Sequence, residues 1–128
     1  MNTTTLSVKN LLIESRIHNN LETEIDRFKH LSDLLREYKS HKQSLETLTE
    51  SESLDMSNLI FEECAKVFAE SKKALKKAKS SDHVGTIHEA LKAANAALNE
   101  LEGLVVDIED VLEEALNDLE KSDGLKKN

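Results

Sequence analysis

The chain has 128 residues, a formal net charge of −8, no proline, three glycines and one cysteine. This acidity argues against direct nucleic-acid binding through the overall field, since such binding neutralises phosphates with Lys and Arg. The lone cysteine excludes an intramolecular disulfide framework, and no run approaches the roughly 20 apolar residues of a membrane span. We therefore expect one domain over residues 1–128. Because the N-terminus lacks a signal-peptide pattern, we expect a cytoplasmic protein, or one exported by a route that leaves no cleavable signal.

The first helical pattern covers residues 6–17 and follows residues 1–5, which we expect to fray. A polar interruption, His18-Asn19-Asn20, consists of poor helix formers. Two interpretations stay open: residues 6–17 form a separate short helix, or they extend the next helix. The apolar residues of this segment are Leu6, Leu11, Leu12, Ile13 and Ile17.

A better-phased heptad pattern covers residues 21–48 and predicts the first long helix. Lys42 occupies a position where the pattern requires an apolar residue, so the seam weakens near its end. A polar run follows, in which Thr49, Ser51 or Ser53 can cap the next helix. The apolar residues of this seam are Leu21, Phe28, Leu31, Leu35, Tyr38 and Leu45.

The second predicted helix, residues 54–79, alternates large and small residues at its seam, which suits interdigitation with a neighbouring helix. Its large residues are Leu54, Phe61, Phe68 and Leu75, and its small ones are Ser57, Cys64, Ser71 and Ala78. Lysines crowd its second half, where they complement the helix dipole or form a basic patch. These lysines are Lys66, Lys72, Lys73, Lys76, Lys77 and Lys79.

The third predicted helix runs from Ile87 to about Glu120, with Thr86 and Glu89 as a capping box and residues 122–128 as a frayed tail. Its buried stripe uses three of seven heptad positions, which is typical of a bundle helix. Because the loops are short, we expect an all-α antiparallel bundle of three long helices with coiled-coil-like packing. The main seam is Ile87, Leu91, Ala94, Leu98, Leu101, Val105, Ile108, Leu112, Ala115 and Leu119.

The residues give little support to catalysis. The five histidines lack the spacing of a helical metal pair, so we expect no metal and no cofactor. Cys64 falls on the apolar seam, where a thiol behaves as a small hydrophobe with a raised pKa. No arrangement typical of a nucleophile with its base, or of a phosphate-binding loop, is present in the sequence. We expect a protein that is not an enzyme.

Acidic residues load the second half of the third helix, where they oppose its dipole and repel one another at i,i+4 spacing. Helix stability alone does not select such a pattern. One interpretation is an ordinary solvated face, and the other is a docking surface for a basic protein. The candidate partner-binding residues are Val106, Asp107, Glu109, Asp110, Glu113, Glu114 and Asp118.

Three functions follow as hypotheses. The first is a protein–protein interaction module, such as an adaptor, chaperone or inhibitor, that binds another protein and could form a homodimer. The second is an acidic decoy that mimics nucleic acid and occupies the basic groove of a DNA- or RNA-handling protein. The third is a helical protein that coats a lipid surface, against which the acidity and the shortage of aromatic residues argue.

Overall fold

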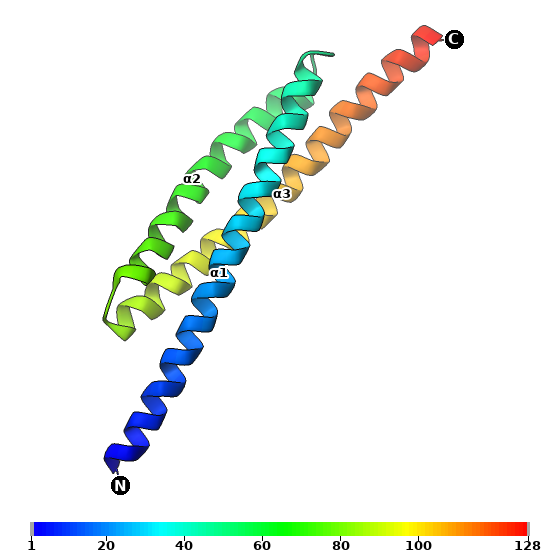
Figure 1. Cartoon of the computed structure of the whole chain (residues 1–128). Coiled ribbons are helices and arrows are strands. Elements are labelled where there is room, and N and C mark those ends of the chain that lie inside the picture. The colour runs from blue at the N-terminus through cyan, green and yellow to red at the C-terminus, as the bar shows by residue number, and fades with distance from the viewer. Residues whose placement is uncertain (1, 128) are drawn as a thin grey trace.

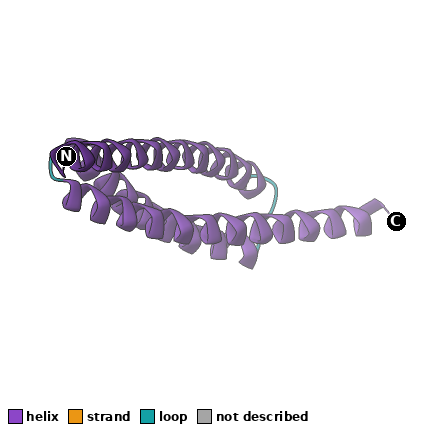
Figure 2. Cartoon of the chain, turned by 90° about the horizontal axis from the view of Figure 1, so that it is seen from below, coloured by secondary structure: helices purple, strands orange, loops and turns teal. Residues whose placement is uncertain are grey.

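The computed structural model describes the backbone of residues 2–127 and the side chains of residues 20–121. Its three helices are α1 (Asn2–Glu46), α2 (Glu52–Ser80) and α3 (Val84–Lys127). α2 runs antiparallel to α1 and α3, and two short loops connect the helices at opposite ends (Figures 1 and 2). The predicted all-α three-helix bundle is confirmed for this part of the chain. None of the described helices combines the length and the apolar character that crossing a bilayer requires.

Both termini extend the helices beyond the bundle. α1 is one continuous helix, so residues 6–17 extend it; their side chains lie outside the described part. Residues 18–20 do not break the helix, because each poor helix former costs less than about 1 kcal/mol of helix stability relative to Ala. No proline or glycine occurs there. α1 projects past the α2–α3 loop, and α3 extends past the α1–α2 loop (Figure 1). The backbone is helical at residues 2–5 and 122–127, where we expected fraying.

Local hydrogen bonds define where α2 and α3 begin. Ser51 caps α2, and its hydroxyl accepts a hydrogen bond from the Ser53 N–H at 3.1 Å. The predicted cap of α3 at Thr86 is wrong, because α3 already begins at Val84. Instead, Nδ1 of His83 accepts a hydrogen bond from the Thr86 N–H at 3.4 Å, and the His83 carbonyl accepts one from the Ile87 N–H. The imidazole thus takes the role expected of the threonine hydroxyl.

The most deeply buried contacts of the bundle lie between α2 and α3. Small side chains at every seventh position of α2 let the two backbones approach closely, and all of them are buried. The hydroxyls of Ser57 and Ser71 donate to the carbonyls of Leu54 at 2.6 Å and Phe68 at 2.8 Å. The two buried serines therefore need no partner from another helix. On α3, the residues with no exposed surface are Ala94, Leu98, Leu101, Ile108 and Ala115.

α1 packs less deeply against this pair. Among its described residues only Leu31 and Glu24 are buried, and its other seam residues stay half-exposed. The rings of Phe28 and Phe68 meet edge to face with centroids 4.7 Å apart, which joins α1 to α2. Half-burial means that each α1 side chain removes less apolar surface from water than its counterparts on α3.

Lys42, which interrupts the apolar pattern of α1, joins α1 to α2. Its Nζ donates to Oδ1 of Asn58 at 2.7 Å and lies 3.4 Å from the carboxylate of Glu46. The same ammonium lies 5.5 Å from the centroid of the Phe61 ring, within the range of a cation–π contact. The aliphatic stem of the lysine covers apolar surface while its head is satisfied by polar partners.

We expect Leu101→Ala to lower the free energy of unfolding by about 2–5 kcal/mol, because it leaves a cavity between helices in the core. Leu59 is 61% exposed, so Leu59→Ala is the matched control and should change that energy by about 0.5 kcal/mol or less. Urea unfolding followed by circular dichroism measures both. Equal losses for the two variants would contradict the burial pattern.

Candidate functional site

The acidic residues of α3 do not share one face. All seven candidate partner-binding residues are exposed, but their neighbours differ. Asp118 lies beside α2, where the hydroxyl of Ser51 donates to its carboxylate at 3.5 Å. Glu109 and Glu113 lie on the other flank, beside α1. Of the predicted surface, these two glutamates line a concave feature.

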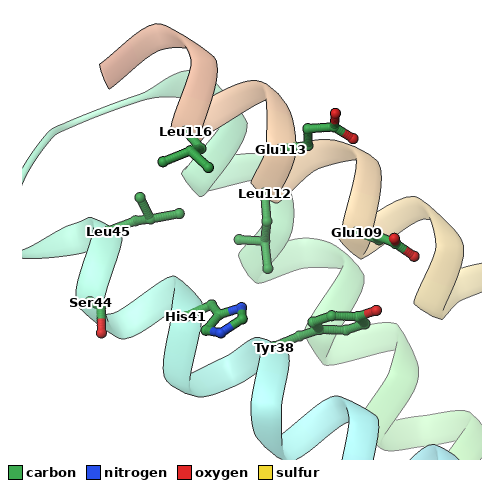
Figure 3. Close-up of a pocket in the computed structure, with 8 residues that line it drawn as sticks. All are labelled: Tyr38, His41, Ser44, Leu45, Glu109, Leu112, Glu113 and Leu116. Atoms are coloured by element: carbon green, nitrogen blue, oxygen red, sulfur yellow. The ribbon is translucent and has the colours of Figure 1, made fainter. Parts of the chain in front are cut away.

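That feature is a groove of about 390 Å³ between α1 and α3, which we call the α1–α3 groove. It lies near the C-terminal end of α1, where α3 diverges from its neighbour (Figure 1). Leu112 points into the space between the helices, and the carboxylates of Glu109 and Glu113 lie at the α3 edge (Figure 3). The lining residues are Tyr38, His41, Ser44 and Leu45 from α1, and Glu109, Leu112, Glu113 and Leu116 from α3.

The floor and rim of the groove differ in chemistry. Leucines 45, 112 and 116 supply an apolar floor, and Leu116 remains 43% exposed although it is a large aliphatic side chain. Both acids lie on the α3 rim, whereas the α1 rim carries only Ser44 and His41 as polar residues besides Tyr38. An exposed apolar surface with charge on one edge is typical of a binding surface.

Tyr38 and Glu109 meet at one end of the groove. The pKa of the Tyr38 phenol is raised, first by burial and then by the charge of Glu109 and a hydrogen bond to it, with a smaller effect from Glu37. The phenol therefore stays protonated, and its O–H is a hydrogen-bond donor to the carboxylate.

A polar network, which we call the α1–α3 clasp, joins the same two helices closer to the α2–α3 loop. Nη2 of Arg27 donates to Oε1 of Glu102 at 2.9 Å and to Oδ1 of Asn99 at 2.7 Å. Nη1 of the same guanidinium donates to Oε2 of Glu24 at 3.0 Å. Nδ2 of Asn95 donates to Oε1 of Glu24 at 3.3 Å, so each group of the clasp has a partner.

The clasp holds a buried charge in place. Burial alone would lower the pKa of Arg27, but the hydrogen bond to Glu102 and the charges of Glu24 and Glu102 raise it overall. Glu24 is only 7% exposed and needs this cation, because an unpaired buried carboxylate is strongly unfavourable. The clasp was not predicted from the sequence. The signal was Glu24 itself, which occupies the same heptad position as Leu31, Tyr38 and Leu45.

The residues with intrinsic reactivity lie away from the groove. Cys64 is 2% exposed, and burial, followed by the charges of Glu63 and Asp107, raises the pKa of its thiol to about 11. Such a thiol is a poor nucleophile at neutral pH. Among the described side chains, no group of three or more His, Cys, Asp or Glu residues is arranged to hold a metal ion.

Arg27→Ala should lower the free energy of unfolding by about 1–3 kcal/mol, because it leaves the buried Glu24 carboxylate without its cation. Arg36→Ala is the control, since Arg36 is largely exposed and lies 3.9 Å from an equally exposed Asp33. Glu24→Leu combined with Arg27→Leu should recover part of the loss, because no buried charge is then unpaired. Urea unfolding measures all three, and a neutral Arg27→Ala would contradict the role of the clasp.

The Cys64 thiol predicts how stability depends on alkaline pH. Its pKa rises from 9.0 to about 11 on folding, so the folded chain holds this proton more tightly than the unfolded chain. The resulting stabilisation is complete below the lower value and decreases as the pH rises toward the higher one. The free energies of unfolding of the native chain and of Cys64→Ala should therefore converge or cross as the pH rises from 8 to 11. A constant difference between the two would contradict the raised pKa.

Comparison with protein-family models, with curated proteins and with solved structures finds no match to this chain. The site consists of an apolar groove between two parallel helices, two carboxylates on one edge of it, and a polar clasp that joins the same two helices closer to the α2–α3 loop.

Proposed function

We propose that this chain is a non-enzymatic protein–protein interaction module, and that the α1–α3 groove is where it binds another protein. The observation that carries the proposal is the groove itself, in which leucines from two helices stay accessible beside carboxylates of α3. A monomeric bundle gains nothing from leaving such a surface uncovered, whereas a partner would bury it.

The charge of the chain supports a basic partner. The net charge is −8, and the exposed acids of α3 include Glu109 and Glu113 on the groove rim and others outside the groove. Such a field speeds the encounter with a positively charged protein, and the apolar floor supplies affinity after contact. Adaptors, chaperones and inhibitors all work by this kind of contact, and the three remain alternatives within the proposal.

The other two hypotheses receive less support from the geometry. A decoy for nucleic acid needs carboxylates in one regular array, and Asp118 lies on the opposite flank of α3 from Glu109. A lipid-coating helix needs a continuous apolar face bordered by basic residues, and the groove is bordered by acids. A second copy of the chain also remains an alternative partner.

Site-specific photo-crosslinking in host cells tests the proposal. A benzophenone amino acid in place of Leu116 should give a discrete adduct with another protein, because this position lies in the groove. The same substitution at Lys72, which is exposed on α2, is the control and should give none. The proposal is contradicted if position 116 yields no protein adduct, or if both positions yield the same one.

A further inference from the structure

From the shape and charge of the α1–α3 groove we infer its occupant: one amphipathic helix of another protein, with aliphatic anchors one turn apart and Lys or Arg on the side that faces α3. This inference rests on the proposed function, because it assumes that the groove binds protein. It adds the class of the bound segment and its orientation.

The walls of the groove favour a helix over a small molecule. Its volume of about 390 Å³ would accommodate a small ligand, since such pockets commonly measure about 300–1,000 Å³. However, all lining residues come from two helices, so a small ligand would lack a third wall and stay exposed. A helix laid along the groove supplies that wall itself and completes a four-helix arrangement locally.

The length of the groove sets the spacing of the anchors. It extends from Tyr38 to Leu45 on α1 and from Glu109 to Leu116 on α3. Seven residue steps correspond to about 10 Å of helix, or roughly two turns. Residues three, four or seven apart lie on one face of a helix. Two or three aliphatic residues at this spacing on the guest can therefore contact the three leucines of the floor.

The uneven charge of the rim orients the guest. Glu109 and Glu113 are four residues apart, so both carboxylates lie on the same edge of α3. Two basic residues four apart on the guest match this spacing. The lining residues of α1 include no acid, so the basic side of the guest should face α3 and its neutral side α1. Glu102 does not compete for these cations, because it is paired with Arg27.

Synthetic peptides of about 16 residues, long enough to form a helix, provide the test with the full-length chain. The basic peptide has leucines at i, i+4 and i+7 and lysines four apart on one flank. A second peptide replaces the lysines with glutamates, and a third replaces the leucines with serines. By fluorescence anisotropy, we expect the basic peptide to bind at least about tenfold more tightly than either alternative.

Paired charge reversals locate the binding. In Glu109→Lys with Glu113→Lys, the preference should reverse, so that the glutamate peptide binds more tightly than the lysine peptide. Asp110→Lys with Glu114→Lys is the matched control, because it makes the same change in net charge at the same spacing outside the groove lining. This control should keep the preference for the basic peptide.

Three results would overturn the inference. One is no binding of the basic peptide at about 1 mM, where even weak helix–groove complexes would form. Another is equal binding of the serine peptide, which would assign the contact to charge alone. The third is a change, with protein concentration and without peptide, in the NMR resonances of the residues that line the groove. This result would make a second copy of the chain the occupant. If position 116 gives a protein adduct but the basic peptide does not bind, the inference that the occupant is an amphipathic helix is refuted, and the proposed function is not.

Discussion

The close packing of α2 against α3 is the interaction on which the rest of the structure depends. The small seam residues of α2 bring the two backbones together, and Leu98, Leu101 and Ile108 of α3 fill the space with no exposed surface. A core of this kind tolerates little change in volume, so the pair forms a rigid platform. Ser57 and Ser71 fit within it because their hydroxyls bond to their own helix.

α1 joins this platform through fewer deeply buried side chains, and polar groups complement them. The clasp holds α1 against α3 through Arg27, and Lys42 holds α1 against α2 through Asn58. Beyond the clasp Leu31 of α1 is buried in the core, and the groove begins at Tyr38 and Glu109. The groove lies where α3 diverges from the C-terminal end of α1 (Figure 1). Leucines of both helices still line the space between them there.

Acidic charge and accessible leucines occur together at the α1–α3 groove. Acidic residues are frequent on the solvent side of the second half of α3, and two of them, Glu109 and Glu113, border the leucines of the α1–α3 groove. Charge alone would attract basic molecules of many kinds, because it acts at long range and without direction. The leucines add a requirement for shape and apolar contact, which is what gives a binding surface selectivity. The proposed function depends on both features together.

The amino-acid sequence by itself determined the three long helices, their antiparallel bundle and the buried seam of α3, because the apolar stripe recurs with the helical period, is wide enough for a bundle and is interrupted only by short loops. It also indicated that Cys64 is buried and that Ser51 can cap α2. Spacing within one helix could not reveal which acids face a cavity, nor that Arg27 binds Glu102 of α3 and Asn95 of α3 donates to Glu24. Those facts depend on how far two helices approach and where they diverge, which only the tertiary structure decided.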